Sequence, residues 1–183
     1  MKRLEVLDIC TGSGAVAISI ARLMGNEVKM KITASDISSA ALKMAKKNAE
    51  KNMVKKIEFL EGDLFSPFIR SKGDTSKPKK AFDFIIGNPP YIPTEVLPTL
   101  QREVREHEPM IALDGGDDGL SIIKRILKEA PNHLKNEGIL MLEIGHDQGA
   151  AMMEMAESYN VYDNIRIKKD LAGHDRVFIA SAR

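Results

Sequence analysis

The stretch that decides the fold runs from Val6 to Met24 and reads VLDICTGSGAVAISIARLM. Val6 to Cys10 is a short apolar run, which predicts a buried strand. Thr11 to Gly14 interrupts that run with two glycines, and Ala15 to Met24 is small, apolar and compatible with a helix. A strand, a glycine turn and a helix in this order predict the first unit of a parallel α/β sheet.

The same alternation continues along the chain. Further strands are expected at Met30–Ser35, Ile57–Leu60, Phe82–Gly87, Gly138–Ile144, Val161–Lys168 and Arg176–Ala180. Helices are expected at Ser39–Asn52 after a Ser38 cap, Leu97–Glu106, Leu120–Leu134 after an Asp118 cap, and Asp147–Tyr159, with 71–80 as a surface insertion. The pattern predicts one doubly wound α/β domain over 1–183, whose seven-stranded sheet is mostly parallel, has helices on both faces and ends in an antiparallel pair.

Composition narrows the class of protein. Lys and Arg number 27 against 26 Asp and Glu, so the net charge of +1 gives no global field that attracts nucleic acid. One cysteine excludes an internal disulfide and a cysteine-based zinc site, and the four histidines lack metal-ligand spacing, so no metal site is expected. No apolar stretch approaches the roughly 18–20 residues that span a bilayer. We therefore expect a cytoplasmic protein without a membrane partner.

The turn after the first strand matches a nucleotide-binding pattern. Gly12, Gly14 and Ala17 satisfy G-x-G-x-x-G/A, and Asp36 follows about 20 residues later. A carboxylate at that strand end accepts from both hydroxyls of a ribose. The pattern fits a nicotinamide-dependent enzyme and a methyltransferase equally well.

Two further carboxylates favour the methyltransferase. Asp8 lies inside the apolar strand, where it repels a pyrophosphate but orients the ammonium group of an amino-acid-like ligand. Asp63 closes the third strand, where it accepts from an adenine amino group while Leu64 and Phe65 pack on the ring. S-adenosylmethionine has the ammonium, the ribose and the adenine, and it has no phosphate.

Asn88-Pro89-Pro90-Tyr91 follows directly on the apolar run Phe82–Gly87. Ligands of open α/β sheets bind beyond the carboxyl ends of the strands, so this tetrapeptide is expected to face a crevice. The side-chain oxygen of Asn88 and the carbonyl of Pro89 each accept one N–H of a planar NH2 group, which directs the nitrogen lone pair at a methyl donor. Tyr91 packs against that group as a wall.

Taken together, these segments resemble the class I S-adenosylmethionine-dependent methyltransferases. More narrowly, they resemble the bacterial peptide-chain release factor glutamine methyltransferases of the HemK type. The motifs that carry the resemblance are 7–14, 35–38, 61–65 and 88–93, and the narrower markers are 108–116, 142–145 and 170–177.

The resemblance implies N5-methylation of the glutamine in the Gly-Gly-Gln motif of release factors, which are then the protein partners. The implied cofactor is S-adenosylmethionine, which leaves as S-adenosylhomocysteine. Its expected binding residues are Asp8, Thr11, Gly12, Gly14, Asp36, Ile37, Asp63, Leu64 and Asn88. The expected catalytic groups are Asn88 and Pro89, and the expected substrate-binding residues are Pro90, Tyr91, Glu108 and Pro109.

The chain departs from the family pattern at two points. Cys10 occupies the first glycine position of the common motif, while the two later glycines remain. The family also has an N-terminal helical domain before the first strand, and this chain begins at that strand. We therefore expect the catalytic domain alone, without the helical domain that docks the substrate.

Three other functions remain open on the sequence. The first is methylation of an exocyclic amine of adenine or guanine in DNA, rRNA or tRNA, in which the Lys77, Lys79 and Lys80 cluster contacts RNA. The near-neutral charge argues against that function. The second is a module that binds the cofactor without turnover, and the third is a nicotinamide enzyme, which leaves Asp8 and the Asn88 tetrapeptide unexplained.

Overall fold

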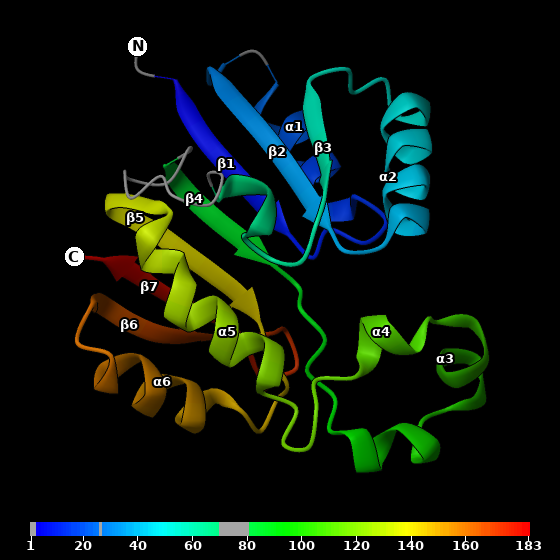
Figure 1. Cartoon of the computed structure of the whole chain (residues 1–183), viewed down its shortest axis with the longest axis vertical. Coiled ribbons are helices and arrows are strands. Elements are labelled where there is room, and N and C mark those ends of the chain that lie inside the picture. The colour runs from blue at the N-terminus through cyan, green and yellow to red at the C-terminus, as the bar shows by residue number, and fades with distance from the viewer. Residues whose placement is uncertain (1–2, 26, 70–80) are drawn as a thin grey trace.

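The computed structural model describes residues 3–25, 27–69 and 81–183. The expected insertion at 71–80, with its lysine cluster, lies outside these residues. Within the described ranges, one sheet contains seven strands in the order β3-β2-β1-β4-β5-β7-β6 (Figure 1). The strands are β1 (Leu4–Ile9), β2 (Met30–Asp36), β3 (Ile57–Glu61), β4 (Phe82–Gly87), β5 (Leu134–Glu143), β6 (Tyr162–Lys169) and β7 (Asp175–Ala182).

Helices cover both faces of the sheet, with α1 behind it and α5 in front of it in Figure 1. The α-helices are α1 (Ala15–Met24), α2 (Ser39–Lys51), α3 (Arg102–His107), α4 (Met110–Leu113), α5 (Ser121–Glu129) and α6 (Gly149–Ser158). The 3₁₀ helices are η1 (Ser66–Phe68), η2 (Thr94–Thr99) and η3 (Ala130–Asn132). No helix in the described ranges is long and apolar enough to reach across a bilayer.

The direction of the strands confirms the predicted fold class. β1 pairs in parallel with β2 and β4, β2 with β3, and β4 with β5, whereas β7 is antiparallel to both β5 and β6. The chain leaves β1 toward β2 and returns on its other side at β4. Such a reversal of strand order opens a crevice at the carboxyl ends of the strands, where ligands of doubly wound folds bind.

A hydrophobic core lies on each face of the sheet. On one face, α1 packs against the small cluster around Val6, Ile32 and Ala34. On the other face, α5 contributes to a larger cluster through its buried side chains Ile123, Ile126 and Leu127. Their spacing at i, i+3 and i+4 is the pattern of a helix that buries one side. Both cores fix the strand ends that surround the crevice.

Two predicted helices have the wrong bounds, in each case because of proline. The predicted helix Leu97–Glu106 is divided into η2, which contains Pro98, and α3, because a proline in that path has no N–H to donate. The predicted helix Leu120–Leu134 ends at Glu129, since Pro131 lies in the short helix η3, which begins at Ala130, and Leu134 already belongs to β5. Asp118 accepts the Leu120 N–H at 3.0 Å, although Leu120 is the N-cap.

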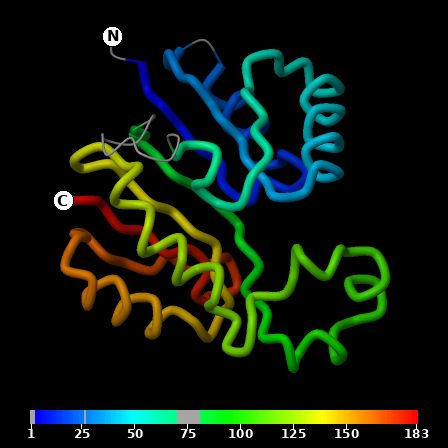
Figure 2. The backbone as a smooth tube through the Cα atoms, viewed as in Figure 1, coloured from blue at the N-terminus to red at the C-terminus, as the bar shows by residue number. Residues whose placement is uncertain are grey.

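Between β4 and α5 the chain makes a closed excursion, which we call the 92–114 lobe. Its two ends are joined by backbone hydrogen bonds from Ile92 N–H to Leu113 and from Gly115 N–H to Ile92, at 3.0 and 2.9 Å. Leu97 is buried, whereas most of the lobe is exposed. In Figure 2 the lobe projects from the carboxyl edge of the sheet beside the β1 and β2 ends. It therefore forms one side of the crevice.

Candidate functional site

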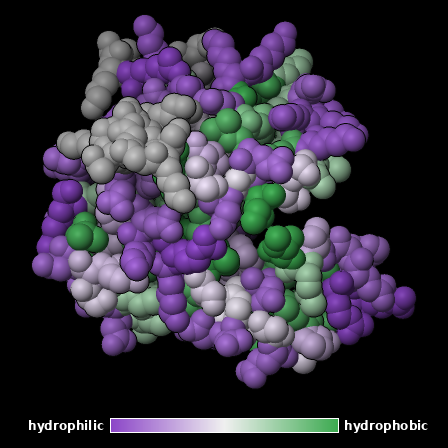
Figure 3. Space-filling model, in the orientation of Figure 1, coloured by the Kyte–Doolittle hydropathy of each residue, from purple (hydrophilic) through white to green (hydrophobic). Residues whose placement is uncertain are grey.

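A cavity of about 450 Å³ lies at the carboxyl ends of β1, β2 and β3. Figure 3 shows a hollow on this side of the molecule, with apolar side chains at its edge, between α2 and the lobe. The expected site residues that line the cavity are Asp8, Thr11, Gly12, Asp36, Ile37, Asp63, Leu64, Asn88, Pro90, Glu108 and Pro109. The expected site residues that do not line it are Gly14, Pro89 and Tyr91. The sequence motifs thus converge in one place.

The turn between β1 and α1 is built from left-handed backbone. Cys10, Gly12 and Gly14 have φ angles of 56°, 54° and 79°. A side chain on Gly12 meets nothing within 4 Å, so this glycine faces open space beside the cavity. A Cβ on Gly14 comes within 3.0 Å of the Cβ of Ala45 in α2. Gly14 therefore permits the start of α1 to pack closely against α2. It supports the cavity without lining it.

Asp36 is fixed by backbone donors from two segments. Its Oδ2 accepts the Gly12 N–H, and its Oδ1 accepts the Ser38 N–H, both at 2.8 Å. Each carboxylate oxygen has a second lone pair, so the group can still accept a pair of hydroxyls from a ligand. Ser38 also caps α2, because its hydroxyl accepts the Ala41 N–H at 3.2 Å, as the sequence predicts.

Asp8 is the buried carboxyl of the site, with 1% of its surface exposed. Its Oδ2 accepts from the Thr11 hydroxyl at 2.5 Å and from the Ala17 N–H at 3.0 Å. Burial raises the pKa of Asp8 to about 6, although these two hydrogen bonds lower it, and the neighbouring Asp36 adds to the increase. A cationic ligand group in the cavity offsets that cost, because it favours the ionised carboxylate.

Asp63 is not a lone acceptor, because Arg125 of α5 donates to its Oδ2 at 2.6 Å. Arg125 and Ile122 both line the cavity, and sequence reasoning missed them. The expected helix over these residues carried a signal: positions 122 and 125 are i and i+3, so they share one face. The partner, however, is 62 residues away along the chain, and no local pattern shows that separation.

Asn88 and Pro90 reach the cavity from the end of β4, and Asn88 is exposed there. Tyr91 instead turns toward the sheet, where its hydroxyl donates to Oε1 of Glu143 at 3.1 Å. Burial and the carboxylate of Glu143 raise the pKa of the Tyr91 hydroxyl, and Arg176 partly opposes them. Tyr91 therefore anchors the loop to β5, and its role as a wall for the substrate stays a prediction.

Gln148 is a second anchor that sequence reasoning missed. This buried side chain donates from Nε2 to the carbonyls of Tyr91 and Gly119, at 2.9 and 3.3 Å. Its Oε1 accepts the Gly145 N–H at 2.8 Å. One amide thus joins the loop after β4, the turn after β5 and the segment before α5. Gly119 has no room for a side chain, since a Cβ added there would clash with the Tyr91 carbonyl.

The 92–114 lobe supplies the outer side of the cavity. Glu108 and Pro109 line it together with Ile111 and Ala112. All four residues are exposed, and Ile111 leaves 57% of its surface in solvent. The position agrees with the substrate-facing role that the sequence predicts for Glu108 and Pro109, and that role stays a prediction.

Burial keeps the side chains of Cys10 and His133, which lie near the site, in their neutral forms. Burial raises the pKa of the Cys10 thiol to about 12, and the negative charges of Asp36 and Asp8 add to the increase. Cys10 is therefore a packing residue, since the thiolate is the nucleophilic form. His133 is buried beneath Phe65, with the two rings stacked at 4.4 Å, and burial lowers its pKa to about 4.

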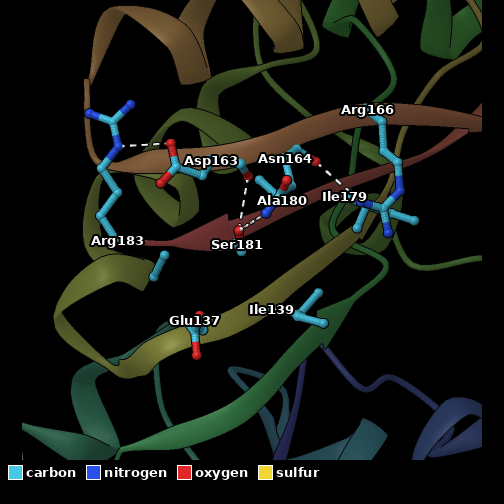
Figure 4. Close-up of a pocket in the computed structure, with 10 residues that line it drawn as sticks. Glu137, Ile139, Asp163, Asn164, Arg166, Ile179, Ala180, Ser181 and Arg183 are labelled. Atoms are coloured by element: carbon cyan, nitrogen blue, oxygen red, sulfur yellow. Dashed lines mark hydrogen bonds and ion pairs between the residues drawn. The ribbon is translucent and has the colours of Figure 1, made fainter.

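A second hollow, of about 280 Å³, lies at the other end of the strands, between β5, β6 and β7. Figure 4 shows that several of its polar side chains bind one another. Arg183 donates to Asp163 at 2.9 Å, and Asn164 donates to the Ser181 hydroxyl at 3.0 Å. The predicted motif residues do not line this hollow, and most of them line the first cavity instead.

Known proteins resemble the chain over almost its whole length. Release factor glutamine methyltransferases of Thermosynechococcus vestitus, Thermodesulfovibrio yellowstonii and Bacillus subtilis are 42%, 39% and 39% identical to it. The matches cover 95–97% of this chain and 57–58% of those proteins. The chain therefore spans less than three fifths of the length of these relatives.

Solved structures share the fold at lower identity. The ribosomal protein L11 methylase of Lactobacillus delbrueckii superposes with a TM-score of 0.64 at 23% identity, covering 100% of this chain and 72% of that one. A Thermus thermophilus 16S rRNA N2 G1207 methyltransferase, solved with AdoMet and guanosine, superposes with a TM-score of 0.62 at 18% identity. That match covers 98% of this chain and 38% of the methyltransferase. The family model for a methyltransferase domain matches residues 1–175. With the doubly wound sheet and the converging motifs, this match shows that the chain belongs to the methyltransferase-domain family.

Proposed function

We propose that this chain transfers a methyl group from S-adenosylmethionine to the side-chain amide nitrogen of glutamine in the Gly-Gly-Gln motif of release factors. The observation that carries the proposal is the position of Asn88, which is exposed at the end of β4 and lines the same cavity as Asp8, Asp36 and Asp63. The names of the relatives support glutamine as the acceptor. Translation termination places this activity in the cytoplasm.

The cavity fits S-adenosylmethionine by charge and by size. Among the described residues, its lining contains four carboxylates, from Asp8, Asp36, Asp63 and Glu108, and one basic side chain, from Arg125. An acidic lining suits a cofactor that carries a sulfonium and an ammonium group and lacks phosphate. The volume of about 450 Å³ lies in the range of small-molecule sites. In addition, the buried Ser35 hydroxyl borders the cavity and has no hydrogen-bond partner among the described residues.

Three carboxylates divide the recognition of the cofactor among them. Asp36 accepts from the ribose hydroxyls, since its two oxygens are already aligned by the Gly12 and Ser38 N–H groups. Asp8 stabilises the ammonium group from beneath the glycine turn, and Asp63 accepts from the adenine amino group. When bound, S-adenosylmethionine supplies an electrophilic methyl group that needs no metal or covalent intermediate.

The chain's own contribution to the reaction is to hold a weak nucleophile. An amide nitrogen is poorly nucleophilic because its lone pair is delocalised into the carbonyl. If the Asn88 oxygen and the Pro89 carbonyl each accept one N–H, the nitrogen can pyramidalise, and the same oxygens stabilise the positive charge that develops on it. The C–N bond would form as the bond between sulfur and the methyl group breaks, and the methylated nitrogen would then lose one N–H proton to water. This function requires a loop that keeps its position during the reaction.

The contacts of Tyr91 and Gln148 support that requirement. The Tyr91 hydroxyl donates a hydrogen bond to Glu143 of β5, and the Tyr91 carbonyl accepts one from Gln148. The loop is therefore attached to the sheet on the side away from the cavity, which leaves Asn88 and Pro90 facing the cofactor site. A rigid loop of this kind holds a substrate nitrogen in line with the methyl donor without a catalytic acid or base.

A methyl-transfer assay with radiolabelled S-adenosylmethionine tests the proposal. The substrates are a release factor with its Gly-Gly-Gln motif, the same factor with that glutamine replaced by alanine, and total RNA. We expect label on the first and none on the second or third. Label on RNA but not on the release factor would instead support methylation of an exocyclic base amine, to which the same two acceptors are suited.

A further inference from the structure

One face of helix α5 packs in the core, and a neighbouring face lines the cavity. Ile123, Ile126 and Leu127 are buried in the core, which leaves Ile122 and Arg125 on the neighbouring side, where both line the cavity. Arg125 is the one basic side chain among the described residues of the lining. Its Nη2 donates to Oδ2 of Asp63 at 2.6 Å, so a cation stands beside the carboxylate that follows β3.

This ion pair is only half buried. The Arg125 and Asp63 side chains are 45% and 46% exposed. Exposed pairs of this kind contribute little to folding, because water screens them and two long side chains must be ordered. The pair therefore has no strong structural role in the free protein, although both of its residues line the cavity.

The geometry of a carboxylate decides how the pair acts on a ligand. Arg125 occupies Oδ2 of Asp63 and leaves Oδ1 as an acceptor. A guanidinium is planar and directional, so it also sets the rotation of the carboxylate. A ligand that covers the pair removes water from it and thereby strengthens the orienting interaction.

We propose that Arg125 is a positioning residue for the adenine of the cofactor: by binding Oδ2 of Asp63, it aims Oδ1 at the adenine 6-amino group. This inference rests on the proposed function, since it assumes that S-adenosylmethionine occupies the cavity. Arg125 therefore raises selectivity for an amino group over an oxygen at that position of the base. Ile122, which precedes it by one helical turn, packs beside the same end of the cavity.

The chain offers a matched control one residue away. Lys124 pairs with Asp118 at 2.5 Å, and these side chains are 45% and 49% exposed. The two ion pairs thus share a helix, a degree of exposure and a short distance. Neither Lys124 nor Asp118 lines the cavity. Lys124→Ala therefore reproduces the loss of an α5 ion pair without touching the proposed site.

Calorimetric titration tests the inference without the methyl-transfer reaction. The probes are S-adenosylhomocysteine and S-inosylhomocysteine, in which a 6-oxo group replaces the amino group. We expect Arg125→Ala to weaken the adenosyl ligand about three- to tenfold and the inosyl ligand less than about twofold. Arg125→Lys should recover part of the loss, and Lys124→Ala should change neither affinity. In an Asp63→Ala background, Arg125→Ala should have no further effect, because coupled residues are not additive.

Three results would overturn the role of Arg125: unchanged affinity for the adenosyl ligand, a gain in its affinity, or an equal loss for both ligands. A gain means that Arg125 competes with adenine for Asp63, and an equal loss means a structural contribution. If the unmodified chain binds neither ligand, the proposed function fails, and this inference fails with it. Urea denaturation of each variant checks that folding is retained.

Discussion

Replacing Asp8 by Asn should stabilise the protein while it weakens cofactor binding. Burial raises the pKa of Asp8 to about 6, which means that the folded protein resists the charge on this group. Asn keeps an oxygen that can accept from the Thr11 hydroxyl and the Ala17 N–H, and it carries no charge. The difference from an ordinary aspartate corresponds to about 3 kcal/mol at pH 7.

The pH dependence of this gain has a definite sign. The folded state binds the Asp8 proton more tightly than the unfolded chain, so the contribution of Asp8 to stability is present below about pH 4 and is lost as pH rises to about 6. Asp8→Asn should therefore match the parent protein near pH 4 and exceed it by about 3 kcal/mol at pH 7.

Equilibrium urea denaturation of both proteins at pH 4.5 and pH 7.5 measures the two differences. Asp118→Asn is the control, because its stability difference from the parent should have the opposite sign at neutral pH. Hydrogen bonds from Lys124 and the Leu120 N–H lower the pKa of this exposed carboxyl, so the folded protein favours its charge. In the same variant of Asp8, affinity for S-adenosylhomocysteine should fall, because the ammonium group loses its carboxylate. A stability difference that is equal at both pH values, or that favours Asp8 at neutral pH, refutes the reasoning.

Three further changes test other parts of the structure. Gln148→Glu should lower the single-turnover methyl-transfer rate about tenfold, because a carboxylate cannot donate to the Tyr91 carbonyl, whereas the exposed control Gln101→Glu should not. Cys10→Gly should be about 1 kcal/mol more stable to urea than Cys10→Ala, because φ at this position is 56° and only glycine adopts it without strain. His133→Phe should gain stability over the parent as pH falls from 6.5 toward 4, since burial lowers the pKa of this imidazole and folding resists its protonation; equal pH profiles contradict this account.

Local sequence was sufficient to predict most elements of the fold. The helix α1 has the predicted bounds, because the glycine turn ends at Gly14 and Gly25 ends the helix. The strand β4 also has its predicted bounds, between an uninterrupted apolar run and the Asn-Pro-Pro turn. Errors occurred where proline has several structural options: Pro98 lies inside one 3₁₀ helix, and Pro131 lies inside another.

Only those parts of the site that belong to short motifs at strand ends could be predicted from the sequence. Asp8, Asp36 and Asp63 line one cavity because parallel strands end at one edge of a sheet. The pairing of Arg125 with Asp63 spans 62 residues, and that of Gln148 with Tyr91 spans 57. Such contacts depend on how helices pack over the sheet, and no short-range pattern encodes them. The hydrogen bond from Tyr91 to Glu143 could not be predicted for the same reason, since Glu143 lies on another strand.

The most direct test of the account is the rate of methyl transfer in a single turnover by Asn88→Ala. The account predicts a rate lower by about 5- to 150-fold, which corresponds to about 1–3 kcal/mol for one lost hydrogen-bond partner in the transition state. Affinity for S-adenosylhomocysteine should stay within about threefold, since Asp8, Asp36 and Asp63 remain. An unchanged rate contradicts the claim that the loop after β4 holds the reacting nitrogen.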